Sequence, residues 1–96
     1  LSTIVVNESI SYNPQSKRLI ENEEDLNVPI KVITLFELCL ENRGKTITKE
    51  MIVSRLWSTS EGYSEGSIRV YINNLKKILG KESINNIKGV GYKIEF

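Results

Sequence analysis

The spacing of the apolar residues changes at Pro29, and this change limits the possible folds more than any other feature of the sequence. Before Pro29, short runs of β-branched and aromatic residues alternate with turn-forming residues, a pattern typical of strands joined by hairpins. After it, apolar residues recur at helical spacing as far as Leu79, and the tail returns to strand-like alternation. The sequence therefore predicts one α+β domain covering residues 1–96.

The segment 1–28 predicts an antiparallel four-stranded sheet at the N-terminus. Turn-forming residues, such as the run 13–16, separate its strands. The expected strands are Thr3–Val6, Ser9–Tyr12, Arg18–Glu21 and Leu26–Val28.

A three-helix core is expected over residues 29–82. The first helix begins after Pro29 and is apolar over more than half of its circumference, which predicts a central position in the core. Thr48 is a suitable N-cap for the second helix and Ser64 for the third, which ends at Gly80.

The tail, residues 83–96, predicts a β-hairpin, so that the whole arrangement is a winged helix-turn-helix with this hairpin as its wing. Gly89-Val90-Gly91 could also suggest a phosphate-binding loop. The remaining glycine of a dinucleotide fingerprint and its strand-to-helix context are missing, however. Glycines at the tip of a tight hairpin are the simpler explanation.

The third helix, about residues 65–79, is the segment most informative about function. Ile68, Ile72, Leu75 and Leu79 form a narrow stripe that must face the core. No carboxylate occurs from Ser67 through Lys81. The surface opposite the stripe is polar, basic or small and apolar, and it consists of Arg69, Val70, Asn73, Asn74 and Lys77, with Tyr71 and Lys76 at its edges.

Such a surface suits the major groove of duplex DNA. Arginine can pair with guanine, amides can pair with adenine, and a small apolar group can contact a thymine methyl. An ordinary solvated helix face is the alternative. For DNA we expect base contacts from Arg69, Val70, Asn73 and Asn74. Phosphate and minor-groove contacts are expected from Ser67, Tyr71, Lys76, Lys77 and Lys88.

The distribution of charge favours the same reading. Residues 1–28 hold two basic and five acidic residues, residues 29–66 are balanced, and residues 67–96 hold six basic and two acidic residues. Cations gathered at one end suggest a surface that faces a polyanion, although a solvated face would also explain them.

Residue types that support catalysis or bind metals are scarce. The chain has no histidine and one cysteine, Cys39, which lies among apolar residues and is expected to be a buried structural thiol. Trp57 could stack on a base, but a core position fits its spacing better. We expect no enzyme, no cofactor and no metal site. A winged-helix module that binds another protein, without specific DNA binding, is the alternative function.

Several motifs resemble one known family. They are Asn42-Arg43-Gly44-Lys45, Thr48-Lys49-Glu50, Leu56-Trp57, the run from Ser67 to Lys77, and Ile87-Lys88-Gly89-Val90-Gly91-Tyr92. With these motifs and the lengths between them, the sequence from about Leu26 to Tyr92 resembles the OmpR/PhoB-type DNA-binding effector domain of bacterial two-component response regulators. The small sheet before the helices also fits that family.

The resemblance implies how the domain works. The third helix would enter the major groove of a promoter, and the wing would touch the adjacent minor groove. The loop 58–66, with Glu61, Tyr63 and Glu65, would contact RNA polymerase. Family members commonly bind direct repeats as homodimers, and a receiver domain precedes their effector domain. We therefore expect the C-terminal part of a longer cytoplasmic protein, with no membrane partner.

The sequence departs from the family pattern at the start of the third helix and at positions of this helix that contact DNA in the family. Gly66-Ser67 stands in place of the usual Arg-Thr pair. Arg69 replaces a frequent acidic residue, Tyr71 replaces a frequent histidine, and Asn74 and Lys76 replace frequent arginines. The resemblance therefore implies DNA binding, but the family's base preference does not transfer.

Overall fold

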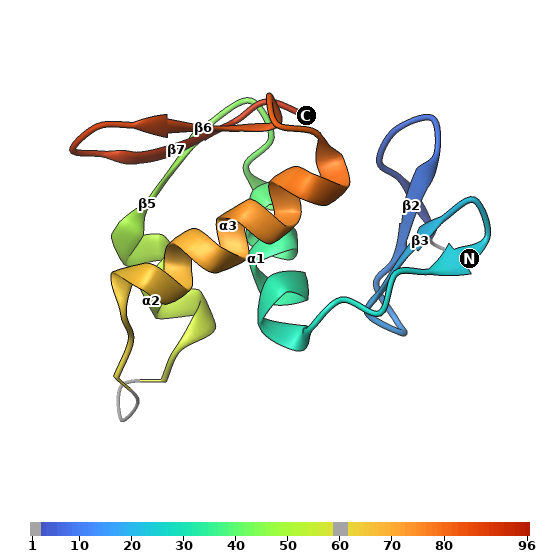
Figure 1. The fold of residues 1–96 in the computed structure, drawn as a ribbon, viewed down its shortest axis with the longest axis horizontal. Coiled ribbons are helices and arrows are strands. Elements are labelled where there is room, and N and C mark those ends of the chain that lie inside the picture. Colours follow the sequence, from blue (N-terminus) through green and yellow to red (C-terminus); the bar gives the residue numbers. More distant parts are fainter. Residues whose placement is uncertain (1–2, 59–61) are drawn as a thin grey trace.

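The winged helix-turn-helix expected from the sequence is present in the computed structural model, which describes residues 3–58 and 62–96. The N-terminal four-stranded sheet, three helices and C-terminal hairpin follow in the predicted order (Figure 1). The elements are β1 (Ile4–Val5), β2 (Ile10–Asn13), β3 (Arg18–Glu21), β4 (Glu24–Asp25), α1 (Ile30–Glu41), β5 (Thr46–Thr48), α2 (Lys49–Leu56), α3 (Glu65–Leu79), β6 (Ile84–Ile87) and β7 (Gly91–Ile94).

The N-terminal sheet is antiparallel, with strand order β1-β2-β3-β4. Its fourth strand is Glu24–Asp25 and not Leu26–Val28, which the sequence predicted. Asn22 and Glu23 have φ angles of 50° and 71° and form a two-residue turn, so that Glu24 already pairs with Glu21. Two positive φ angles give the turn the twist of a tight hairpin, which shortens the expected four-residue turn to two residues.

Helix α1 lies at the centre of the core. The side chains of Val32, Leu35 and Phe36 on this helix are fully buried. The N-terminal sheet packs against α1, and the ring of Tyr12 meets Phe36 edge-on with the ring centroids 4.9 Å apart. The Tyr12 hydroxyl donates a hydrogen bond of 2.5 Å to Glu37 Oε2 on the same helix. The first predicted helix is thus the element that joins the sheet to the rest of the domain.

Helices α2 and α3 begin at the predicted caps. The Thr48 hydroxyl accepts a hydrogen bond from the Met51 backbone N–H at 3.1 Å, and the Ser64 hydroxyl accepts one from the Ser67 N–H at 3.1 Å. Helix α3 ends at Gly80, whose φ of 109° suits glycine. These local interactions set where α3 starts and stops, and the helix crosses the front of α1 in Figure 1.

The C-terminal hairpin gains a third strand that the sequence did not reveal. Strand β5 pairs with β7, which gives the sheet order β5-β7-β6. The two backbones approach so closely that a Cβ atom on Gly91 would lie 2.0 Å from the Ile47 carbonyl oxygen. Glycine at this position therefore lets β5 anchor the hairpin beside the start of α2. The hairpin tip and the N-terminal sheet lie at opposite ends of the molecule (Figure 1).

Candidate nucleic-acid interface

Helix α3 has one buried and one exposed side, as its residue spacing predicted. Ile68, Ile72 and Leu75 are buried. On the other side Val70 is 57% exposed, although it is apolar. We call this side the recognition face; Arg69, Val70, Asn73 and Lys77 are exposed on it, and Asn74 and Lys76 at its border are half-buried.

The polar groups of the recognition face have no partners within the described part of the chain. The side chains of Arg69, Asn73 and Asn74 make no hydrogen bond or ion pair to residues 3–58 or 62–96. The same holds for Lys76, Lys77 and, on the hairpin, for the exposed Lys88. Guanidinium, amide and ammonium donors are therefore available to an external ligand.

Two of the residues expected to contact phosphate make contacts within the domain. The hydroxyl oxygens of Ser67 and Ser64 lie 2.9 Å apart at the start of α3. The ring of Tyr71 stacks on Trp57 with centroids 6.0 Å apart and an interplanar angle of 28°. These contacts hold both side chains in place at the edge of the recognition face.

Trp57, at the C-terminal end of α2, is the centre of an aromatic cluster with Tyr63 and Tyr71. It is half-buried and packs against the core, in agreement with the core position preferred from its spacing. The ring of Tyr63 lies 5.9 Å from that of Trp57, and the Lys31 ammonium lies 5.1 Å from the centre of the Trp57 ring. Tyr63 itself is 44% exposed.

The structure separates the residues of the predicted polymerase-contact loop. Tyr63 precedes α3 and belongs to the aromatic cluster. Glu65 is the first residue of α3 and points toward α2. Glu61 lies outside the described residues.

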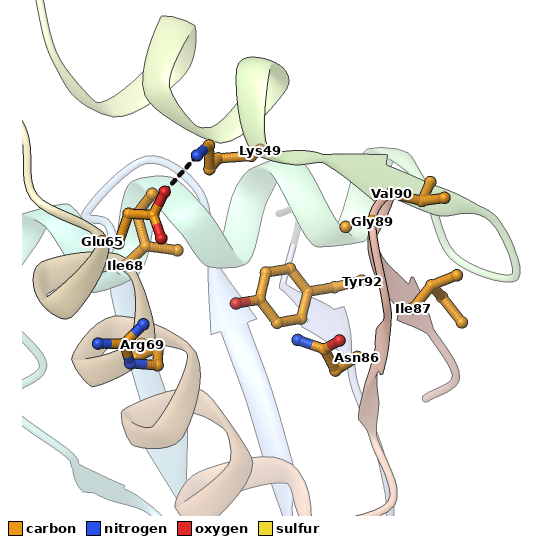
Figure 2. A pocket seen from close by; sticks show the side chains of 10 residues that line it. Lys49, Glu65, Ile68, Arg69, Asn86, Ile87, Gly89, Val90 and Tyr92 are labelled. Carbon is orange, nitrogen blue, oxygen red and sulfur yellow. Dashed lines mark hydrogen bonds and ion pairs between the residues drawn. The ribbon is translucent and has the colours of Figure 1, made fainter.

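A groove of about 360 Å³ separates the start of α3 from the hairpin (Figure 2). The Tyr92 hydroxyl points across it toward α3, with Asn86 beside Tyr92 (Figure 2). The groove is lined by Lys49, Glu65, Ile68, Arg69, Asn86, Ile87, Gly89, Val90, Gly91 and Tyr92. We call this space the wing groove.

Lys49 and Glu65 form an ion pair at the upper end of the wing groove (Figure 2). Their mutual hydrogen bond and charge interaction raise the pKa of Lys49 and lower the pKa of Glu65. The charge of Arg69, one helical turn after Glu65, also lowers the pKa of that carboxyl. Both side chains of the pair remain exposed to solvent.

Three polar residues that line the wing groove were not among the candidate site residues, namely Lys49, Asn86 and Tyr92. Tyr92 and Lys49 each belong to a motif that carried the family resemblance, so those motifs could have suggested them. Asn86 lacks such a signal, because it lies just before the motif that begins at Ile87.

Metal ligands and the cysteine thiol were two further features of interest in the sequence. The described residues contain no group of three or more His, Cys, Asp or Glu side chains that could hold a metal ion. Cys39 is buried, and burial raises the pKa of its thiol to about 12, which agrees with the structural thiol expected from the sequence. No helix among the described residues is long and apolar enough to cross a membrane.

Comparisons with known proteins agree with this arrangement. The sequence pattern of the family "Transcriptional regulatory protein, C terminal" matches residues 13–94. The regulatory protein VanRB of Enterococcus faecalis is 30% identical over 82 residues, which are 85% of this chain and 37% of VanRB. The chain spans less than half the length of such curated relatives.

Solved structures share the fold at low sequence identity. The response regulator DrrB of Thermotoga maritima, an OmpR/PhoB homologue, aligns with a TM-score of 0.79 at 18% identity, covering 98% of this chain and 44% of DrrB. The DNA-binding domain of Klebsiella pneumoniae RstA, solved with its RstA box, aligns with a TM-score of 0.73 at 19% identity, covering 99% and 98% of the two chains. The chain therefore belongs to the family of C-terminal domains of transcriptional regulatory proteins, and it has the winged-helix fold of the OmpR/PhoB-type DNA-binding domains.

Proposed function

We propose that this domain binds duplex DNA sequence-specifically as the effector part of a bacterial response regulator. The observation that carries the proposal is the recognition face, where cations, amides and one apolar side chain are exposed without partners in the described part of the chain. An α-helix is about 10–12 Å across with its side chains, and the major groove is about 12 Å wide. Helix α3 therefore fits the groove with its recognition face toward the bases.

Base edges would be read by side chains of the recognition face and its border. Arg69 would donate to guanine O6 and N7, and Asn73 and Asn74 would pair with adenine N6 and N7. Val70 would contact a thymine methyl, which explains why an apolar side chain is left 57% exposed.

The sugar-phosphate backbone would be held from both sides of α3. Lys76, Lys77 and Lys88 supply cations, and Ser67 and Tyr71 supply hydroxyl groups at the edge of the recognition face. In the wing groove, Lys49 and Tyr92 would donate hydrogen bonds to the phosphates of a DNA strand that lies between α3 and the hairpin. Since Lys88 lies at the tip of the hairpin, it would reach the adjacent minor groove.

Further partners follow from the family. A receiver domain would precede this chain in the full protein, and two copies would bind direct repeats as a homodimer. RNA polymerase would contact the segment 58–66, in which Tyr63 is exposed beside Trp57. Glu61 and Glu65 are the acidic residues of this segment in the sequence.

The test is enrichment of bound sequences from a random duplex pool at physiological salt. Recovery of a short motif, repeated about one helical turn apart, would support specific reading by tandem copies. Retention of duplex without any motif would contradict base reading by this domain. If no duplex is retained, the domain instead contacts another protein, which is the alternative function for such a fold.

A further inference from the structure

Glu65 is an acidic residue on a surface that is otherwise suited to a polyanion. No other acidic residue occurs in α3, which runs from Glu65 to Leu79. Its carboxylate is ion-paired with Lys49 of α2, and the two side chains are 61% and 42% exposed. Together with Arg69 and Tyr92, the pair lines the wing groove. The proposed function places a DNA strand in this groove.

This arrangement gives Lys49 two possible anionic partners. A carboxylate oxygen and a phosphate oxygen both accept charge-assisted hydrogen bonds from a lysine ammonium. In the domain without DNA, the carboxylate of Glu65 already occupies the ammonium of Lys49. A lysine ammonium has three N–H donors, so a phosphate that enters the wing groove can still bind Lys49. It meets a cation whose charge the Glu65 carboxylate already offsets, however, and that carboxylate repels it.

We propose that Glu65 is an intramolecular competitor of DNA phosphate at Lys49, and that it lowers the affinity of the domain for the DNA backbone. This inference rests on the proposed function and names a residue that tunes it. A protein cation that neutralises a phosphate releases a counterion that was condensed on the DNA. A cation already paired with an acid neutralises the phosphate less, so its contact contributes less to the salt-dependent part of binding. Glu65 thereby increases the dependence of binding on the base contacts made by the recognition face.

Direct reading of a base by Glu65 is the competing explanation, because a carboxylate can accept a hydrogen bond from the cytosine amino group. The two explanations predict opposite signs. Removal of a competitor tightens binding to every duplex, whereas removal of a base reader weakens binding to the preferred sequence.

The experiment compares wild type, Glu65→Gln and Glu8→Gln on one random-sequence duplex by fluorescence anisotropy at several salt concentrations. Glu8→Gln is the matched control, since it makes the same change in net charge on an exposed turn of the N-terminal sheet. We expect Glu65→Gln to bind about threefold more tightly, and its plot of log K against log salt to steepen by about one. Glu8→Gln should change both quantities much less.

A second substitution tests whether the gain passes through Lys49. Adding Lys49→Gln to Glu65→Gln should abolish the gain, because the released ammonium is then absent. Glu65→Asp keeps the charge but shortens the reach to Lys49, so it should show part of the gain even if Glu65→Gln folds poorly. Thermal denaturation identifies any variant that is unfolded.

The inference is overturned if Glu65→Gln binds random duplex no more tightly than wild type, or if the gain persists without Lys49. A loss confined to the preferred sequence would also overturn it and would make Glu65 a base reader. If wild type itself retains no duplex, the proposed function fails, and this result is distinct from the outcomes above.

Discussion

The cations of residues 3–58 and those of α3 and the hairpin are used in different ways. In the first region Lys17 pairs with Glu37 at 2.7 Å, and Arg55 pairs with Glu41 at 2.6 Å. Arg18 pairs with Asp25 in the N-terminal sheet. Each of these pairs joins two elements of the fold or two strands of the sheet.

On the recognition face and at the hairpin tip the cations have no such partners. Arg69, Lys76, Lys77 and Lys88 make no ion pair within the described part of the chain. Exposed ion pairs contribute little to stability, so leaving these cations unpaired costs the fold little. Unpaired cations do, however, retain their attraction for phosphate. These cations of the first region pair within the fold, whereas those of the recognition face and the hairpin tip remain available to an external polyanion, which is what the proposed function requires.

The largest effect is expected from a change in the core of the N-terminal sheet. Leu19 is 1% exposed, and Leu19→Ala should lower the free energy of unfolding by about 2–5 kcal/mol because it leaves a cavity. Urea denaturation measures this loss. The salt slope of DNA binding by the folded fraction should stay as in wild type. A changed slope would show that the sheet takes part in DNA binding and would break the comparison.

A change on the recognition face should instead weaken DNA binding and leave the free energy of unfolding unchanged. Asn74→Ala should weaken binding to the enriched motif by about 1–3 kcal/mol and relax base choice at one position. Its unfolding curve should match that of wild type, since the Asn74 side chain has no partner within the described residues. Titrations on the motif and on random duplex separate the cases, and an equal loss on both would count against base reading.

A change at Glu37 tests the paired region through pH. Burial alone would raise the pKa of this carboxyl, but hydrogen bonds from Lys17 and Tyr12 and the charges of Lys17 and Arg55 hold it below its usual value. A lowered carboxyl pKa adds stability that is present above the pKa of the unfolded state and is lost as pH falls through that of the folded state.

Glu37→Gln should therefore cost about 1 kcal/mol of unfolding free energy at neutral pH. The difference from wild type should shrink as the medium is made acidic below about pH 4.3. Urea denaturation at a series of pH values measures this, with Glu8→Gln as the control. If the difference in unfolding free energy between the two proteins stays constant with pH, the ionised Glu37 carboxylate is not its source.

The smallest effect is expected from single surface lysines. Lys77→Ala should weaken binding to all duplexes alike and reduce the salt slope by about one. Lys17→Ala removes an equal charge from the paired region and should leave the slope unchanged. Anisotropy titrations over a salt series measure both variants, and equal slopes for the two would remove the distinction between the regions.

Sequence patterns predicted those parts of the fold that depend on neighbours along the chain. The spacing of Ile68, Ile72 and Leu75 identified the buried side of α3, and Thr48 and Ser64 marked the helix starts. The strand at Leu26–Val28 was wrong, because a polar turn can hold two or four residues and only backbone φ angles distinguish them.

Strand β5 was missed for a related reason. Its three residues are too few to show a periodic pattern, and the strand exists through its pairing with β7. Gly91 allows that pairing by omitting a side chain where Ile47 approaches. A single sequence records the glycine but does not identify the backbone that approaches it.

By itself, the sequence determined the three helices, their caps and the stretch without carboxylates from Ser67 to Lys81. The helices and caps follow from apolar periodicity and from hydrogen bonds over three or four residues. Only the tertiary structure decided that Lys49, Glu65 and Tyr92 line one groove. These residues are far apart in the chain, and the β5–β7 pairing and the crossing of the helices bring them together. Which cations are paired depends on these long-range contacts, and composition does not record them.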